Sequence, residues 1–449
     1  MLKKKATRRQ FMVNTALTSA ALIAAPYVRG AHAAGSLSIG FWDHWVPGAN
    51  DTLTKLCQEW GEKEKVEVKP DYITSNGFKN LLTMQAEAQA KSGHDIFQFP
   101  TWEPSAHADQ LEPVDDLMKQ LIAANGEVNG VVQYLSHIDG KWVAVPAVTG
   151  TQMKPPHSRI DLFKQFVGMD IVKMYPAGAD PDKELSKQWT WDAFLAAAEK
   201  CHKGGYPFGM PLGVTSDAVD WVGAVFNSYG SQFVDAKGNI TVKSDATRQA
   251  LEYMKKIVAF LPEDVFAWDD ASNNRWLISG KGASIMNPPS AWAVAKRGNP
   301  QVAEQCWYMG CPAGPKGRFG PMLPYFWGIW SFSKNKEAAK SLLTYLWQRS
   351  SVEKLVTASQ GYDLPSFSKL LDFKVWAEEG PPKGTLWHYP SRGDQIQSIT
   401  AAPAPPAIAV QIYNQATHTK MVARITQGKE TIDQAITWAE KELEGFLRT

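Results

Sequence analysis

Alternating apolar and polar residues predict strands in the first part of the chain. Residues 37–42 alternate as a half-buried strand does, and residues 66–70 and 95–99 repeat the pattern. After the first of these strands, apolar residues recur at helical spacing behind the capping candidates Asn50 and Asp51. Alternating strands and helices predict an α/β lobe built on a doubly wound sheet.

The second half of the chain has the same character. A helix should begin at Trp191 with Thr190 as its N-cap, and residues 232–242 read as a hairpin that turns on residues 237–239. Further amphipathic helices are expected around residues 251–258, 338–346 and 432–446. A second α/β lobe is therefore predicted.

The N-terminus carries an export signal. Three lysines and the run R-R-Q-F-M at 8–12 precede an apolar, alanine-rich stretch at 13–28, and A-H-A at 31–33 offers a cleavage site. The paired arginines are typical of twin-arginine export. The stretch is shorter and more polar than the about 20 apolar residues of a spanning helix, so we favour cleavage near Ala33 over a membrane anchor.

The charge and the cysteine content of the chain bear on its binding partners and on its disulfide bonds. Residues 1–33 hold six basic and no acidic residues, so the formal charge of +2 becomes −4 after cleavage. A mildly acidic chain without basic clusters predicts no nucleic-acid or anionic-lipid partner. We interpret the four cysteines as buried thiols, with a Cys306–Cys311 disulfide as the alternative.

The motifs of catalysis are absent from the sequence. It has no G-x-S-x-G elbow, no H-E-x-x-H and no phosphate-binding loop, and its nine histidines show no metal-ligand spacing. The adjacent acids Asp115–Asp116 and Asp269–Asp270 are interpreted as solvated loop acids. We expect no enzyme, no metal and no cofactor. A secreted glycosidase remains an alternative function, since the two catalytic carboxylates of such enzymes have no compact sequence motif.

The tryptophan residues are the sequence feature that points to a class of ligand. The chain has 18 tryptophans, and several stand where a predicted strand ends, as Trp42, Trp102 and Trp327 do. Ligands of open α/β sheets bind at the carboxyl ends of strands. Flat indole faces suit the apolar face of a sugar ring, while neighbouring polar side chains suit its hydroxyls. This pattern favours a carbohydrate-like solute.

Seven short motifs follow one another along the chain. They are G-H-D-I-F-Q at 93–98, L-E-P-V-D-D-L at 111–117, D-G-K-W-V-A-V-P at 139–146, W-T-W-D-A-F at 189–194, G-K-G-A-S-I-M-N at 280–287, K-N-K-E-A-A at 334–339 and Q-G-K-E-T-I-D-Q-A at 427–435. In order and spacing the set resembles the extracellular solute-binding proteins of ATP-driven sugar importers, the family related to maltose-binding protein.

The resemblance implies two lobes joined by hinge strands that close on a ligand without changing its bonds. Residues 34–146 and 312–348 would form the first lobe, and residues 147–311 and 349–449 the second. The protein would act in the periplasm as a monomer. It would deliver a sugar, oligosaccharide or polyol to the membrane permease subunits of an ABC importer.

The resemblance also implies the ligand-binding residues. Phe99 matches an aromatic residue that stacks on sugar, while Trp102 and Glu103 match polar contacts on the loop that follows. The remaining candidates lie at corresponding strand ends and on the wall of the second lobe: Trp42, Asp43, His44, Asp220, Trp221, Trp292 and Trp327.

One stretch departs from the family pattern. Where the family usually shows Y-Y-N-K-D-L-F, this chain has P-P-H-S-R-I-D-L-F at 155–163. The missing tyrosine and asparagine leave the solute open. The alternatives are a polyamine or an amino-acid derivative as the solute, or a secreted carbohydrate-active enzyme in place of a binding protein.

Overall fold

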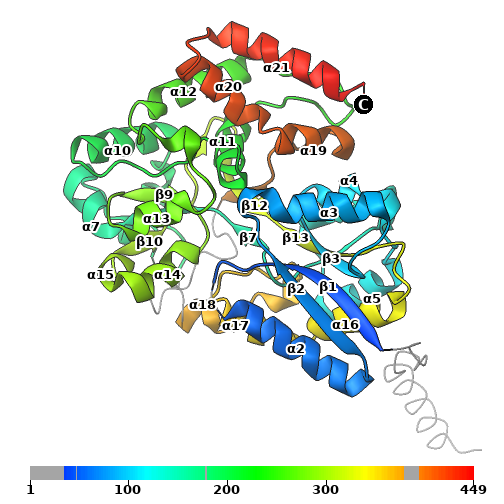
Figure 1. Ribbon diagram of the computed structural model, residues 1–449. Coiled ribbons are helices and arrows are strands. Elements are labelled where there is room, and N and C mark those ends of the chain that lie inside the picture. Colours follow the sequence, from blue (N-terminus) through cyan, green and yellow to red (C-terminus); the bar gives the residue numbers. More distant parts are fainter. Residues whose placement is uncertain (1–34, 47, 177–178, 379–393, 449) are drawn as a thin grey trace, which may run out of the picture.

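A computed structural model describes residues 35–46, 48–176, 179–378 and 394–448 (Figure 1). The predicted signal segment 1–33, with its cleavage site at Ala33, lies outside these residues. Within the described ranges, no helix has both the length and the apolar character needed to cross a membrane.

The first lobe is built on a five-stranded mixed sheet in the order β2-β1-β3-β13-β6. Its strands are β1 (Ser36–Trp42), β2 (Glu67–Ile73), β3 (Ile96–Pro100), β13 (Tyr325–Ile329) and β6 (Val145–Pro146). The pairs β1–β2 and β1–β3 are parallel, whereas β13 runs antiparallel to both of its neighbours. The three strands predicted from alternation are confirmed as β1, β2 and β3.

Helices cover both faces of this sheet (Figure 1). They are α2 (Ala49–Glu64), α3 (Lys79–Ala90), α4 (Glu103–Ala106), α5 (Asp115–Asn125), α6 (Gly130–Ser136), α16 (Lys336–Leu346) and α17 (Arg349–Ala358). The expected capping of α2 is wrong: Gly48, with φ of 95°, is the N-cap. Asn50 instead accepts a hydrogen bond from the His44 backbone N–H at 3.2 Å, which fixes the loop after β1.

Two adjacent strand pairs connect the lobes. The chain leaves the first sheet through β6 and continues into β7 (Gln152–Met153), and it returns through β12 (Gly317–Leu323) into β13. Because β7 pairs with β12 and β6 pairs with β13, the outgoing and returning segments run side by side. The short strands β11 (Ala313–Gly314) and β14 (Gln395–Ser398) extend this connecting sheet.

The second lobe has a smaller sheet of β8 (Pro156–Arg159), β9 (Ser284–Met286) and β10 (Cys306–Tyr308). All its pairs are antiparallel, where a doubly wound mixed sheet was expected. Its main helices are α10 (Trp191–Lys203), α11 (Ser216–Tyr229), α12 (Asp245–Val258), α13 (Ser272–Ile278), α14 (Ser290–Gly298), α19 (Pro406–Asn414), α20 (Thr417–Thr426) and α21 (Ile432–Phe446). Thr190 caps α10 as predicted, accepting a hydrogen bond from the Ala193 backbone N–H.

The predicted hairpin forms only a minimal turn. Val234 and Ile240 make one antiparallel bridge, and Gly238 takes the positive φ that the turn requires. No longer strand pairing develops between these two segments.

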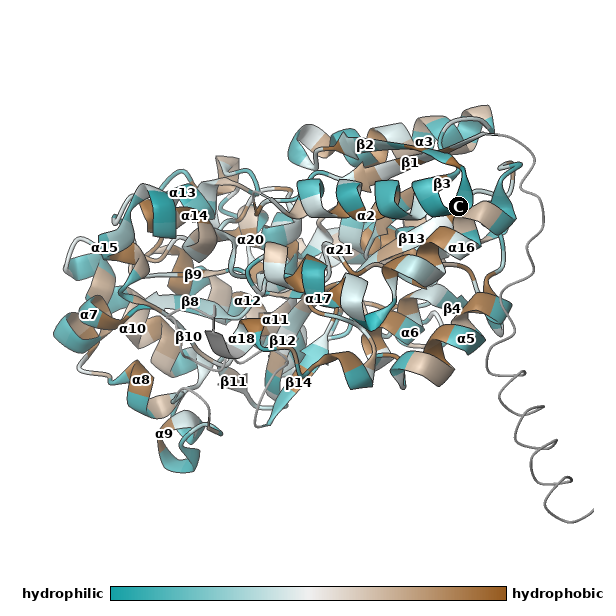
Figure 2. Ribbon diagram, turned by 90° about the horizontal axis from the view of Figure 1, so that it is seen from below, coloured by the Kyte–Doolittle hydropathy of each residue, from teal (hydrophilic) through white to brown (hydrophobic). Residues whose placement is uncertain are grey.

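The core is continuous and largely aromatic and aliphatic. The side of α2 that faces the viewer in Figure 2 is mostly hydrophilic, because Leu53, Leu56 and Trp60 lie on its buried side. All four cysteines are buried free thiols, as expected, and burial raises the pKa of Cys306 to about 12. The residue boundaries proposed for the two lobes remain a prediction, and α17, which they assign to the second lobe, packs on α2 of the first.

Candidate functional site: cavities between the lobes

Three neighbouring cavities lie where the lobes face each other. Their volumes are about 110, 30 and 270 Å³, and all three are lined by Ser75 and Asp270. Ser75 stands on the loop after β2 of the first lobe, and Asp270 precedes α13 of the second. The three cavities therefore form one cleft between the lobes, which we call the interlobe cleft.

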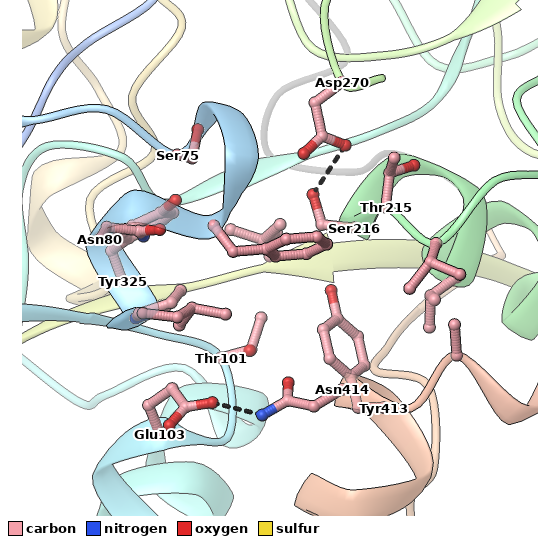
Figure 3. A pocket seen from close by; sticks show the side chains of 17 residues that line it. Ser75, Asn80, Thr101, Glu103, Thr215, Ser216, Asp270, Tyr325, Tyr413 and Asn414 are labelled. Atoms are coloured by element: carbon pink, nitrogen blue, oxygen red, sulfur yellow. Dashed lines mark hydrogen bonds between the residues drawn. The ribbon is translucent and has the colours of Figure 1, made fainter. Parts of the chain in front are cut away.

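Figure 3 shows the 110 Å³ cavity. The first lobe contributes Thr101 and Glu103, the second contributes Thr215 and Ser216, and Tyr325 comes from the beginning of β13. Glu103 reaches the opposite wall, where it accepts a hydrogen bond from Asn414 Nδ2 at 2.6 Å (Figure 3). Aromatic, hydroxyl and carboxylate groups from distant parts of the sequence thus meet in one space.

The N-terminus of α11 forms part of this wall. Thr215 caps the helix by accepting a hydrogen bond from the Ala218 backbone N–H at 3.2 Å, so the helix begins at the cleft. Further along α11, a Cβ at Gly223 would lie 2.0 Å from Thr400 Oγ1. Glycine is required there because the chain segment around Thr400 packs directly on the helix.

A buried lysine sits behind the wall. Lys154 Nζ lies 2.6 Å from Asp217 Oδ1 and 2.6 Å from Asp220 Oδ2, and all three side chains are buried. Burial alone would lower the pKa of Lys154, but the charges of Asp217, Asp220 and Asp270 raise it above its ordinary value. Tyr413 donates a hydrogen bond to the second oxygen of Asp220 at 2.9 Å. Lys154 therefore stays protonated and fixes the segment after β7 to α11.

Asp270 is the carboxylate that faces the cleft. Its Oδ1 accepts a hydrogen bond from Ser216 Oγ at 3.3 Å (Figure 3). The same oxygen accepts a second one from the Asp217 backbone N–H at 3.2 Å. Burial, reinforced by the negative charge of Asp217, raises the pKa of Asp270 to about 6. Ionised Asp270 is thus costly in the cleft unless a ligand pairs with it.

The smallest cavity is lined by both aromatic and polar side chains. Trp42, Trp45, Tyr325 and Tyr362 line it, with the Trp42 ring centroid 5.0 Å from that of Tyr325 and 6.2 Å from that of Tyr362. Its polar side chains include Asn274, Asn287 and Ser290, which are joined to one another by hydrogen bonds.

Of the ten residues expected to bind ligand, Trp42 and Glu103 line the interlobe cleft. Asp220 lies just behind it, through Lys154 and Tyr413. Their roles in binding stay predictions.

The other seven lie outside these cavity linings. Asp43 is exposed and accepts a hydrogen bond from Asn50, while His44 is buried with its Nε2 3.1 Å from Asp363 Oδ1. The remaining five are buried aromatic side chains: Phe99, Trp102, Trp221, Trp292 and Trp327. Trp102 donates from Nε1 to the Thr400 carbonyl and Trp221 to the Pro211 carbonyl, so these two indoles hold backbone segments in place.

Sequence reasoning missed most of the cleft lining. Ser75, Thr215, Ser216 and Tyr325 belong to loops and element ends that carry no periodic signal. The interpretation of Asp269–Asp270 as solvated loop acids is wrong for Asp270, which is half-buried and lines all three cavities. The pair of acids was visible in the sequence, but its burial was not.

No group of three or more His, Cys, Asp or Glu side chains in the described part of the chain is arranged to hold a metal ion. The arrangement is one of hydrogen-bonding and aromatic groups around a small space.

Two α/β lobes joined by paired strands, with a polar and aromatic cleft between them, define a receptor that holds a small solute between its lobes. The chain belongs to the bacterial extracellular solute-binding protein family, whose sequence profile matches residues 47–348. This confirms the resemblance in the motifs. A probable amino-acid ABC transporter periplasmic-binding protein of Sinorhizobium fredii is 27% identical over 173 residues, a match that spans 38% of this chain and 38% of that relative.

Solved structures with the same fold include three with bound ligands. Maltose-bound MalE3 of T. maritima has a TM-score of 0.74 at 18% identity, over 92% of this chain and 99% of its own. A solute-binding protein of Thermotoga lettingae with bound alpha-D-tagatose has a TM-score of 0.71 at 18% identity, over 92% and 100%. One of Agrobacterium vitis with bound D-mannitol has a TM-score of 0.68 at 20% identity, over 92% and 99%. The predicted two-lobed α/β fold is confirmed.

Proposed function

We propose that this protein is the substrate-binding component of an ABC importer, which captures a sugar, oligosaccharide or polyol and delivers it to a membrane permease. Membership of the extracellular solute-binding family supports the receptor role. Export through the twin-arginine signal, cleavage near Ala33, a periplasmic location and a monomeric state belong to the same proposal. So does the absence of catalysis and of a cofactor.

The observation that carries the proposal is the composition of the interlobe cleft. Tyr325 and Trp42 offer aromatic faces, and Ser75, Thr215 and Ser216 offer hydroxyl groups around the same space. A sugar or polyol has both an apolar C–H surface and a fringe of hydroxyls, so these two kinds of group satisfy it together. The ligands in the similar structures, maltose, tagatose and mannitol, are of this chemistry.

The lobe arrangement suggests how binding is signalled. Groups on the cleft come from both lobes, so a ligand that contacts both stabilises the closed arrangement over the open one. The paired connecting strands β6–β7 and β12–β13 are where such a motion would bend. A permease that recognises the closed form would then receive loaded receptor in preference to empty receptor.

A ligand screen tests the proposal. Purified chain beginning at residue 34 would be titrated calorimetrically, and its thermal unfolding followed, with neutral mono- and disaccharides, polyols, amino acids and polyamines. A bound solute at 100 times its dissociation constant should add about 2.7 kcal/mol to the free energy of unfolding. Binding of a sugar or polyol that is recovered intact supports the proposal. Binding of amino acids or polyamines alone, or hydrolysis of the sugar, would overturn it.

A further inference from the structure

The lining of the interlobe cleft carries charge of one sign. Glu103, Asp217, Asp269 and Asp270 line its three cavities, and no Lys, Arg or His is among the described lining residues. A neutral sugar offers hydroxyl groups that both donate and accept hydrogen bonds, and it needs no such excess of carboxylates. The charge of the cleft therefore bears on the ligand.

Three of these carboxylates already have partners. Asp217 is paired with Lys154 at 2.6 Å, and Asp269 Oδ1 is 2.9 Å from Arg275 Nη2. Glu103 accepts a hydrogen bond from Asn414, with His107 Nε2 at 3.6 Å from its other oxygen. Asp270 makes no ion pair with a described residue. The charge of Lys154 acts on Asp270, but this lysine is already paired with Asp217 and Asp220. Asp270 alone of the four therefore faces the space between the lobes without an ion pair to a described residue.

Asp270 also keeps an oxygen open. Both of its hydrogen bonds from described residues, those of Ser216 and the Asp217 backbone, go to Oδ1, and none goes to Oδ2. The neighbouring side chain of Gln152 lines the same 30 Å³ cavity, is 4% exposed, and its Oε1 has no hydrogen-bond partner among the described residues. Two hydrogen-bond acceptors in a largely enclosed space, Asp270 Oδ2 and Gln152 Oε1, thus have no donor among the described residues. An ammonium group supplies three donors and a positive charge.

Aromatic rings complete the surroundings of such a group. Trp42, Trp45, Tyr325 and Tyr362 line this same cavity, and Trp42 lies within 6.4 Å of the other three, measured between ring centroids. The faces of aromatic rings attract cations, most strongly those of tryptophan. A carboxylate that shares a small cavity with several aromatic rings is therefore a suitable place for an organic cation.

We propose that the solute is a hydroxylated amine, an amino sugar or an aminated polyol, whose ammonium group pairs with Asp270 and Gln152 beside Trp42. Its hydroxyl groups bond to the polar side chains of the 110 Å³ cavity, among them Ser75, Thr215 and Ser216. The inference rests on the proposed function, because it assumes that the interlobe cleft is the binding site for a polyhydroxylated solute.

Matched pairs of probes test it. D-glucose with D-glucosamine, and D-sorbitol with D-glucamine, differ by one amine in place of a hydroxyl. Calorimetric titration of the mature chain at neutral pH should show at least one amine binding about tenfold more tightly than its partner, or about 1.4 kcal/mol. Asp270→Asn should abolish this difference. Asp192→Asn, an exposed carboxylate that lines none of these cavities, should preserve it.

If Asp270→Asn fails to fold, Gln152→Leu is the second test variant. It should weaken binding of the amine of the preferred pair and leave the dissociation constant of the neutral partner within about twofold of its parent value. If the neutral partner binds as tightly as the amine, the inference is overturned and the proposed function stands. If only putrescine or an amino acid binds, the carbohydrate part of both proposals fails. If no probe in the pairs or among neutral disaccharides binds, both are overturned.

Discussion

Lys154 Nζ and Asp220 Oδ2 lie 2.6 Å apart with both side chains buried, one on the segment that leaves the first lobe and the other on α11 of the second. Asp217 Oδ1 meets the same ammonium at the same distance. The lysine therefore holds the entry of the chain into the second lobe against the helix whose N-terminus forms the cleft wall.

Lys154→Ala should lower the free energy of unfolding by about 3–5 kcal/mol, because it leaves Asp217 and Asp220 buried without their counter-charge. Urea unfolding followed by tryptophan fluorescence measures this. The control is Lys203→Ala, which breaks an exposed pair with Glu199 at 2.6 Å and should cost less than about 1 kcal/mol. Equal losses in the two variants would show that the buried pairs contribute no more than an exposed one.

Asp270→Asn should stabilise the ligand-free protein at pH values above about 6. The folded-state pKa of about 6 lies above the about 3.9 of an unfolded aspartate. Ionisation therefore costs stability as pH rises past about 4, and the full cost is present above about 6. We expect a gain of about 1–3 kcal/mol near pH 8 that largely disappears near pH 4. Unfolding midpoints of Asp270→Asn and Asp192→Asn at both pH values decide this, and a gain that persists at pH 4 would contradict it.

Two buried histidines should make the protein sensitive to acid. Burial lowers the pKa of His157 and of His418 to about 3, while an unfolded histidine titrates near about 6.5. The unfolded state takes up protons first, so their contribution is fully present above pH about 6.5 and is lost as pH falls toward about 3. Each should cost about 2 kcal/mol at pH about 5.

The His157→Gln/His418→Gln double variant should therefore lose less stability between neutral pH and pH about 5 than the parent does, whatever its stability at neutral pH. His202→Gln, at an exposed position on α10, is the control and should keep the parent's pH dependence. The same change in the free energy of unfolding between neutral pH and pH about 5 in all three proteins would contradict the prediction.

Trp45→Ala should weaken binding of whichever sugar, polyol or amine binds by about 1–2 kcal/mol, since Trp45 is half-buried in the aromatic cavity wall. Trp438→Ala is the matched control. Trp438 is also half-buried, lies on α21 under the Arg424 guanidinium at 4.7 Å, and lines none of the cleft cavities. Calorimetry on both variants should show weaker binding only in Trp45→Ala. A parallel loss in the control would assign the effect to general destabilisation.

Sequence patterns located much of the fold because local periodicity reports which side of an element is buried. The alternation in residues 37–42 placed β1, and helical spacing with Thr190 as cap placed α10. The cap of α2 was misplaced by two or three residues, because Gly48 takes a left-handed conformation that leaves Asn50 free to bond the loop before it.

The candidate site was less accessible to such reasoning. Of the strand-end tryptophans, Trp42 lines the interlobe cleft, whereas Trp102 and Trp327 are wholly buried. A tryptophan at a strand end looks the same in the sequence whether it faces the cleft or the core. The direction depends on which helix or loop from elsewhere in the chain covers it.

By itself the sequence determined that the chain has alternating α/β architecture and shares the ordered motifs of a solute-binding family, because these properties are local or sequential. The export signal remains a prediction. The tertiary structure alone decided that Ser75 and Asp270 face one space and that Lys154 forms its ion pairs with Asp217 and Asp220. It also decided that the hydrogen bonds to Asp270 from described residues go to Oδ1 and not to Oδ2. Burial and charge pairing depend on groups far apart in the chain, and only packing brings those groups together.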